Sequence, residues 1–319
     1  MALPHSLMLT LAPTFACRRA HSRLIRDCYY TAVRHIASSP SLDNSSGAAS
    51  GPASLAGTAP FHTAYVLLHT HLPPAAYPPR SSSRVWRLAT AYMQRWRGTI
   101  NFAWSPDLRT HPEYKGLGEE RPTPDTSPEV YTASVFSVAT PHGRLEIPEL
   151  SLANVQETSD KLQQLVASAG DIDRKPSEMD RTVNEQLDKR LFLFVCTHGS
   201  RDCRCGEGGG EVARAFRREL DKRGISAKDV VLGEVAHVGG HKYAANVLVY
   251  PYGEWLGNVQ EVDVPMILDE ILAWRASYQE RAAQSGGQVQ DMPPLCPPFW
   301  RGRMGLEKEE QIALCQRAA

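Results

Sequence analysis

The chain of 319 residues is expected to adopt an α/β fold, and three stretches of its second half carry that expectation. Leu191 to Cys196 (LFLFVC) is a continuous apolar run, typical of a strand that is buried on both faces. Residues 211–223 place apolar side chains at helical spacing, and Gly224 ends that helix. Residues 230–236 predict the next strand, so strands and a helix alternate as in a layered α/β domain.

Residues 190–285 are predicted to form one small domain. A turn at 237–242, a strand at 243–250 and a helix at 264–281 complete its order of elements. Thioredoxin-like folds have this order of strand, loop, helix, strand, turn, strand and helix. The motifs show no internal repeat.

Residues 61–170 are predicted to form a divergent N-terminal α/β domain. The pattern predicts strands at 65–69, 99–104 and 130–139 and helices at 83–98 and 151–169. A polar connector follows at 170–189, and residues 286–319 are expected to be a C-terminal tail.

The charge and cysteine content exclude several classes of protein. Lys and Arg number 35, and Asp and Glu also number 35, which argues against a nucleic-acid binder. No apolar run approaches the roughly 20 residues that a membrane span needs, so we expect none. The seven cysteines are odd in number and irregular in spacing, unlike a disulfide framework.

The first 60 residues are expected to lie outside the fold. Residues 1–36 hold five arginines and one acid, Asp27, with apolar side chains at helical spacing. This pattern predicts a mitochondrial transit peptide and hence a location in the mitochondrial matrix. Residues 37–60 are rich in Ser, Ala, Gly and Pro and predict a disordered linker.

Four residues near the centre of the chain form a candidate metal site: Cys196, Cys205, His237 and His241. Their pattern is C-x8-C-x31-H-x-G-G-H. Two thiolates and two imidazoles suit a soft or borderline metal. The two glycines between the histidines each cost about 1 kcal/mol of helix propensity, so this segment is predicted to be a tight turn.

Three metal centres fit these ligands. Zinc accepts two cysteines and two histidines, although compact zinc sites usually bring a shorter cysteine spacing. A mononuclear iron site does not explain two separate ligand pairs. A [2Fe-2S] cluster does, since each pair can take one iron, as in Rieske centres. Outside metal chemistry, thiol-disulfide exchange through Cys203 and Cys205, or Cys196 and Cys205, is a further possibility.

Neighbouring residues are expected to have mainly supporting roles. Cys203 is expected to be a bystander thiol and His198 a hydrogen-bonded loop residue. His69 and His71 have metal-like spacing but no cysteine nearby, so structural roles are favoured. Three residues beyond the ligand turn are candidates for contacts behind the ligands: Lys242, Tyr243 and Asn246.

At the cysteine and histidine motifs the chain resembles the sucrase/ferredoxin-like family, also called thioredoxin-like ferredoxins. The segments CTHGSRDCRCG, GEVAHVGGHKYAANVLVYPYGEWLG, NFAWSPD and GRLEIPELSLANV carry the resemblance, and the WRGRMGLEKEEQ segment extends it. The resemblance implies a thioredoxin-like ferredoxin domain in the C-terminal half and a bishistidinyl, non-Rieske [2Fe-2S] cluster. Cys196 and Cys205 would hold the ferric iron, and His237 and His241 the reducible one.

The resemblance also implies a function. The chain is expected to be an electron carrier more than a stand-alone enzyme, acting in mitochondrial redox homeostasis. With its basic leader it is similar to the mitochondrial branch of the family, the altered inheritance of mitochondria proteins. It lacks a nucleotide-binding fingerprint, so a reductase must donate electrons and another protein accept them.

Overall fold

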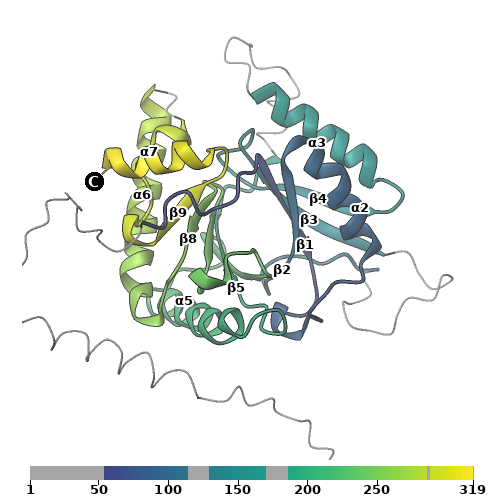
Figure 1. Cartoon of the computed structure of the whole chain (residues 1–319), viewed down its shortest axis with the longest axis horizontal. Helices are drawn as coiled ribbons and strands as arrows, with labels where there is room; N and C mark the ends of the chain where they lie inside the picture. Colours follow the sequence, from purple (N-terminus) through teal and green to yellow (C-terminus); the bar gives the residue numbers. More distant parts are fainter. Residues whose placement is uncertain (1–53, 114–128, 170–185, 286–287, 319) are drawn as a thin grey trace, which may run out of the picture. The chain divides into compact units, whose positions relative to one another are not determined.

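The computed structural model describes residues 54–113, 129–169, 186–285 and 288–318, which lie in one compact unit, Ala53–Ala319. Nine strands of these residues form one sheet in the order β4-β3-β1-β2-β6-β5-β7-β8-β9 (Figure 1). The strands are β1 (Ala64–His69), β2 (Gly98–Trp104), β3 (Val130–Ser137), β4 (Leu145–Ser151), β5 (Leu191–Cys196), β6 (Val230–Val235), β7 (Val247–Tyr250), β8 (Glu254–Leu256) and β9 (Trp300–Arg303).

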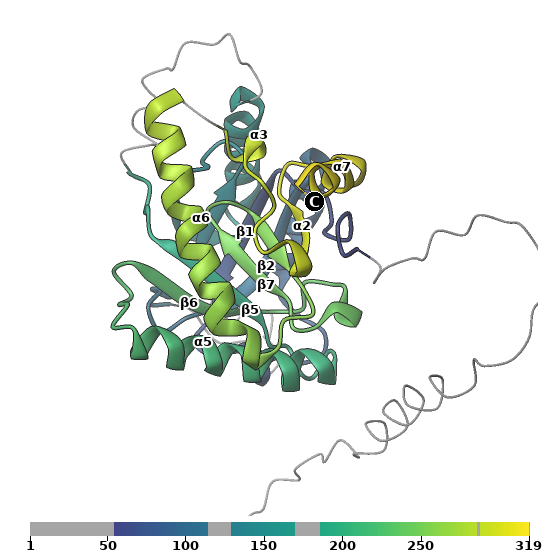
Figure 2. The same cartoon turned by 90° about the vertical axis from the view of Figure 1, so that its left-hand side faces the viewer.

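The α-helices are α2 (Arg84–Met93), α3 (Val155–Ala169), α5 (Gly210–Lys222), α6 (Val264–Ser285) and α7 (Lys308–Ala318). Figure 1 shows α2 and α3 beside the strands of the first half, and Figure 2 shows α5 and α6 beside those of the second half. None of the helices in the described ranges is both long and apolar enough to cross a bilayer.

The α/β fold class and most predicted elements are confirmed. The predicted helix at 83–98 ends earlier, and a 3-10 turn, Gln94–Trp96, completes it. The predicted strand at 243–250 begins later, because His241–Tyr243 forms a 3-10 turn. Four elements were not predicted: β4, β8, β9 and α7.

The two halves of the sheet repeat one topology. In each half a helix joins two parallel strands, a third strand is antiparallel to the first, and a fourth is antiparallel to the third. The order of strands is therefore symmetric about the pair of β2 and β6, except that β9 has no counterpart in the first half. That central pairing is short, since it joins only Ala103 to Val235 and Trp104 to Glu234.

The core has three parts because every inner strand is buried on both faces. In β5, Leu191, Leu193 and Val195 pack with helices α5 and α6, and a second part lies between the first-half strands and helices α2 and α3. Phe192 and Phe194 point the other way, into a core that both halves of the sheet share. There the Phe136 ring of β3 stacks on the Tyr250 ring of β7, with centroids 4.3 Å apart. This shared core explains why the LFLFVC run has no polar face.

The strands of the two predicted domains, 61–170 and 190–285, thus belong to one sheet. The domain boundaries themselves stay a prediction. The predicted transit peptide, 1–36, lies outside the described residues, as does most of the predicted linker, 37–60. The last residues of that linker are packed and not disordered, since the Thr58 N–H donates to the carbonyl oxygen of Arg301.

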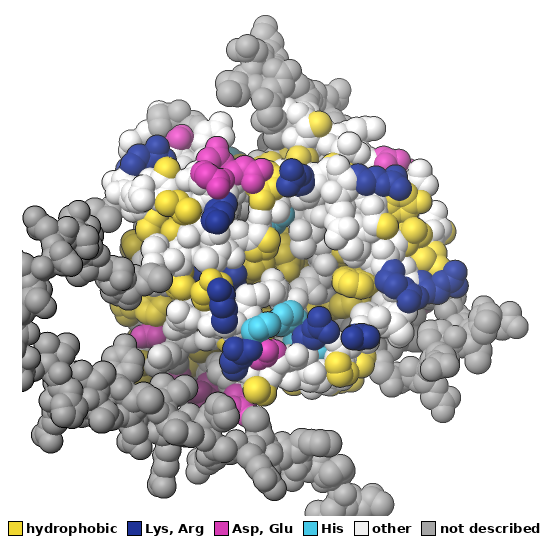
Figure 3. Space-filling model, viewed as in Figure 1, with side chains coloured by type: hydrophobic (Ala, Val, Ile, Leu, Met, Phe, Trp, Pro, Cys, Tyr) yellow, Lys and Arg dark blue, Asp and Glu magenta, His cyan; other side chains and the backbone are white. Residues whose placement is uncertain are grey.

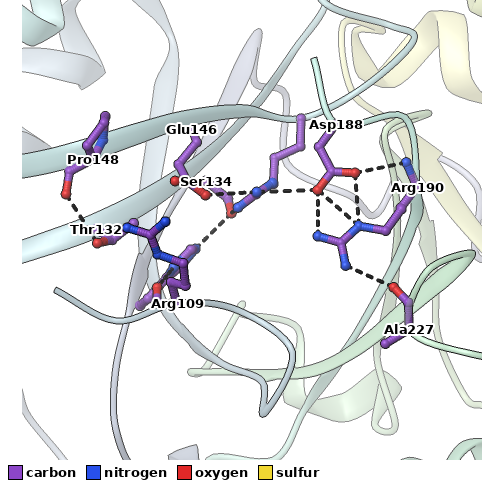
Figure 4. A network of polar contacts seen from close by, with 10 residues as sticks. Arg109, Thr132, Ser134, Glu146, Pro148, Asp188, Arg190 and Ala227 are labelled. Carbon is purple, nitrogen blue, oxygen red and sulfur yellow. Dashed lines mark hydrogen bonds and ion pairs between the residues drawn. The ribbon is translucent and has the colours of Figure 1, made fainter. Parts of the chain in front are cut away.

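A partly buried charge network joins the first half to β5, the strand that ends at Cys196 (Figure 4). Asp188, just before β5, accepts hydrogen bonds from Arg190 at 2.6 and 2.9 Å and lies 3.3 Å from the guanidinium of Arg144. Arg144 also donates to Glu146 of β4 at 2.8 Å. Burial alone would raise the pKa of Asp188, but the hydrogen bonds from Arg190 and the charge of Arg144 hold it below its ordinary value.

Asp188→Asn should therefore destabilise the protein at pH 7 by about 2 kcal/mol, because it removes charged hydrogen bonds from both guanidinium groups. A lowered carboxyl pKa stabilises the folded state above the ordinary pKa, and this contribution is lost as the pH falls through the lower, folded value. The difference between wild type and variant, measured by urea unfolding, should shrink below about pH 4.

Lys161→Gln is the control, because the Glu157–Lys161 pair has side chains that are 69% and 72% exposed. It should leave the free energy of unfolding unchanged within error. A pH-independent loss in Asp188→Asn, or an equal loss in the control, would contradict this account of the network.

Candidate metal centre

The two cysteines reach one point from a strand end and a helix start. Cys196 is the last residue of β5, where its N–H donates to the carbonyl oxygen of Asn246 at 3.0 Å. Cys205 begins a single π-helical turn, Cys205–Gly209, that leads into α5. Both side chains are almost fully buried, at 1% and 0% exposure, and they lie at the end of the core that the two halves share.

Glycines allow this approach. A Cβ on Gly209 would lie 2.0 Å from the carbonyl oxygen of Cys196, and one on Gly206 would lie 2.6 Å from the Cα of Gly199. No side chain fits at such distances, so glycine is required where the π turn meets β5. Gly208, in the same turn, has no atom within 4 Å of a Cβ position.

The histidine segment forms the predicted tight turn. Gly239 and Gly240 both have positive φ, at 83° and 64°, which favours glycine. The Tyr243 N–H donates to the carbonyl oxygen of Gly240 at 2.8 Å and closes the turn. His237 and His241 therefore project from one turn with their ring centroids 5.8 Å apart and their planes at 28°.

Three of the four predicted ligands come together directly. Donor atoms of Cys196, Cys205 and His237 all lie within 4.8 Å of one another, and the Cys205 Sγ is 3.7 Å from the His237 Nδ1. His241 stands beside this trio, with its Nδ1 3.7 Å from a carboxylate oxygen of Asp202 and its side chain 50% exposed. The structure thus places two buried sulfurs next to a pair of imidazoles that leads to the surface.

The pKa values of the two thiols are shifted in opposite directions. A hydrogen bond from Cys205 lowers the pKa of Cys196, and backbone N–H groups of Val238 and His198 lower it further, against burial. The same hydrogen bond and burial raise the pKa of Cys205 far above its ordinary value. One sulfur is a thiolate more readily, and the other keeps its proton because a second thiolate beside it would be repelled.

The donor chemistry fits a thiolate-binding metal centre. A cation between the sulfurs removes the repulsion and replaces the shared proton. His237 lies with the two cysteines and His241 stands apart, so the structure groups the four candidate ligands as three and one. Two cysteines with neighbouring histidines are nevertheless a donor set of the kind that binds a [2Fe-2S] cluster.

The supporting residues mostly take their expected places. The His198 ring contacts the carbonyl oxygen of Pro78 at 3.1 Å, and its Nδ1 accepts from the His237 N–H at 3.3 Å, so it is a hydrogen-bonded loop residue as predicted. Cys203 is exposed, whereas Cys205 is buried. His69 is buried, with its nitrogens 2.6 Å from the Arg109 carbonyl oxygen and 2.8 Å from the Ser134 hydroxyl, which confirms a structural role.

One residue near the turn was not predicted. The guanidinium of Arg301, in β9, touches the ligand turn at Gly240. Two arginines in the segment WRGR indicate an exposed stretch, yet all four of its residues are buried. The resemblance of that segment to a family pattern was the only available signal.

Figure 3 shows histidine side chains on the molecular surface with Lys and Arg side chains to either side. Residues next to the ligands supply exposed cations, namely Arg201, Arg204 and Lys242. The imidazole edge of the site is thus the part that a partner or solvent can reach.

Comparisons with known proteins identify the class. A sequence profile described as Sucrase/ferredoxin-like matches residues 55–286. The chain belongs to this family, as the motifs predicted, and membership supports a redox or iron-sulfur-related role.

Curated relatives share a shorter segment. "Altered inheritance of mitochondria protein 32" of Meyerozyma guilliermondii is 44% identical over 81 residues, which is 24% of this chain and 28% of that protein. "Actin patches distal protein 1" of Saccharomyces cerevisiae is 36% identical over 95 residues, 26% of this chain and 30% of that protein. The matches thus span less than a third of these relatives, and the first name suggests an association with mitochondria.

Among solved structures, the wild-type thioredoxin-like [2Fe-2S] ferredoxin from Aquifex aeolicus is similar over 32% of this chain and 94% of its own. The identity is 21% and the TM-score 0.22, so this similarity carries no argument about the site.

Gly209→Ala should destabilise the protein by about 1–3 kcal/mol, because its Cβ would overlap the Cys196 carbonyl and force the π turn away from β5. The matched variant is Gly208→Ala, where a Cβ meets nothing and a neutral or slightly stabilising effect is expected. Urea unfolding measures both. Equal effects of the two substitutions would show that the close approach at Gly209 does not exist.

Proposed function

We propose that the chain is an electron carrier that holds a [2Fe-2S] cluster through Cys196, Cys205, His237 and His241. The observation that carries the proposal is the convergence of two buried sulfurs with an imidazole, at the end of a turn that presents a second imidazole. When bound, such a cluster stores one electron at a potential above that of all-cysteine ferredoxins.

The cysteines and the histidines have different roles in the proposed site. Cys196 and Cys205 supply negative charge in a place that excludes water. His237 and His241 supply neutral nitrogens, so the site carries less negative charge than four cysteines would. The imidazole of His241 is half exposed, which makes it the contact point for electron exchange with a partner. With one ring nitrogen on the iron, the half-exposed ring would still be open to solvent, so a proton could accompany the electron.

The biological setting is part of the proposal. We infer a role in redox homeostasis in the mitochondrial matrix, supported by the basic leader and by the name of the relatives. A reductase donates the electron and a second protein accepts it. The exposed cations beside the ligands favour acidic contact surfaces on these partners.

Two other functions have specific support. The close trio of Cys196, Cys205 and His237 suits a single zinc ion with one open position. Thiol-disulfide exchange through Cys196 and Cys205 is disfavoured, because both sulfurs are buried and a substrate disulfide cannot reach them. Exchange through Cys203 would require buried Cys205 to move outward.

Cys205→Ser should abolish cluster binding, because a serine hydroxyl does not replace the thiolate. Cys203→Ser should retain it, because that sulfur is exposed and outside the trio. Anaerobic purification followed by iron and acid-labile sulfide analysis distinguishes the two, with two irons and two sulfides per chain expected for Cys203→Ser and wild type. One zinc and no sulfide in wild type would favour the zinc site.

His241→Cys should keep the cluster and lower its reduction potential by roughly 100 mV or more, because a thiolate adds negative charge. In wild type the potential should fall as the pH rises through the alkaline range, by up to about 59 mV per pH unit when one proton accompanies one electron. The variant should lose part of that slope. Protein-film voltammetry across pH measures both quantities.

His142→Cys is the matched control. His142 stacks on Tyr278, and Arg144, two residues further on, pairs with Asp188 just before the start of β5, whereas Cys196 ends that strand. It should leave the potential unchanged. A wild-type potential that stays flat from neutral to alkaline pH would remove the bishistidine assignment.

A further inference from the structure

A buried guanidinium group lies directly behind the histidine turn. Arg301 is 2% exposed, and a Cβ on Gly240 would lie 2.5 Å from its Nη2. Its Nη1 donates to the Asn246 Oδ1 at 2.5 Å, and its Nη2 and Nε donate to the carbonyl and hydroxyl oxygens of Thr58 at 2.7 and 3.1 Å. Every one of these acceptors is a neutral oxygen.

The described residues offer Arg301 no carboxylate partner. The contrast with Arg303, two positions along the same strand, is direct, because Arg303 pairs with Glu254 and both side chains are 0% exposed. The rings of Tyr243 and Trp255 lie 4.7 and 5.7 Å from the Arg301 guanidinium carbon and provide only a partial substitute. A buried charge without a counter-charge is costly, so its presence calls for a negative partner.

The two cysteines lie where they could supply this negative charge to Arg301. Asn246 accepts from Arg301, its Nδ2 donates to the Gly240 carbonyl oxygen at 3.4 Å, and its own carbonyl oxygen accepts the Cys196 N–H. Arg301 is thus linked through one side chain to both ligand segments. Burial lowers its pKa to about 10, against the raising effect of Tyr243 and Cys196, so the group stays protonated at neutral pH.

We infer that Arg301 is a positioning residue that supplies the built-in counter-charge of the cluster site and raises its reduction potential. The inference rests on the proposed function. Two thiolates balance the charge of an oxidised [2Fe-2S] core, and an added electron leaves one net negative charge. A cation held in a water-excluded site stabilises that reduced state more than the oxidised one.

Arg301 comes from the C-terminal segment of the chain. It lies beyond residue 286, where the match to the family profile ends, and its partner Thr58 lies near the start of that match. The segment predicted as a C-terminal tail therefore completes the metal site by bringing a charge behind the ligand turn.

The test is the reduction potential of purified holoprotein at pH 7. Arg301→Met should lower the equilibrium constant for reduction at least tenfold, which is about 59 mV for a one-electron couple. Arg301→Lys keeps the charge and should recover most of this loss. Asn246→Asp keeps the guanidinium but places a carboxylate on it, and should lower the potential as Arg301→Met does.

Arg218→Gln removes an exposed cation on α5 and should leave the potential unchanged. If Arg301→Met fails to fold or to hold the cluster, the reduction potential of Asn246→Asp tests the inference, because that variant retains the arginine. An unchanged potential in Asn246→Asp, or equal potentials in Arg301→Met and Arg301→Lys, would overturn the inference while leaving the electron-carrier proposal intact. Wild-type protein without iron and sulfide would overturn both.

Discussion

The structure depends on the placement of two sulfurs, Cys196 and Cys205, side by side in a core that excludes water. Their mutual hydrogen bond lowers the pKa of Cys196 and raises that of Cys205. Both can carry negative charge only when a cation lies between them. The burial of the sulfurs, the glycines of the π turn and the nearby imidazoles are all consistent with the binding of such a cation. In this view the site is suited to bind positive charge, and the [2Fe-2S] proposal names an occupant that would use both imidazoles as ligands.

The fold supplies this placement through a repeated topology. Two halves of like connectivity meet at β2 and β6, and their inner faces share an aromatic core at the end of which the cysteines lie. Only the second half carries the ligands. The first half contributes the Tyr77 and Pro78 carbonyls, which contact Ser200 and His198 of the cysteine loop. Its role in the site is therefore support for the loop and coverage of the sulfurs.

The histidine turn could be predicted because its glycines and its metal-binding residue types can be read directly from the sequence. His-x-Gly-Gly-His has two residues that adopt positive φ, and the structure uses both in that way. The apolar run of β5 likewise indicated a strand with two covered faces. These features depend on local residue type, which the sequence states directly.

Other features could not be predicted, because they depend on distant partners. The edge strand β4 contains Pro148 and the exposed Glu149 next to each other, which obscures its strand pattern in the sequence. In β9 the arginines are buried only because Glu254 and neutral oxygens of remote segments receive them. The repeated topology lies in the connections between strands and leaves no common motif. The role of Arg301 combines these difficulties, since a charged residue in a predicted tail is buried at the site.

The central claim is that two sulfurs and two ring nitrogens bind one pair of bridged irons. Pulsed electron paramagnetic resonance of the reduced protein, produced with ¹⁵N-labelled histidine, tests it most directly. The account predicts a signal with two distinct histidine nitrogen couplings, which arise from direct coordination to the reduced iron. A signal without nitrogen coupling, or a reduced protein that is colourless and carries zinc, would contradict it.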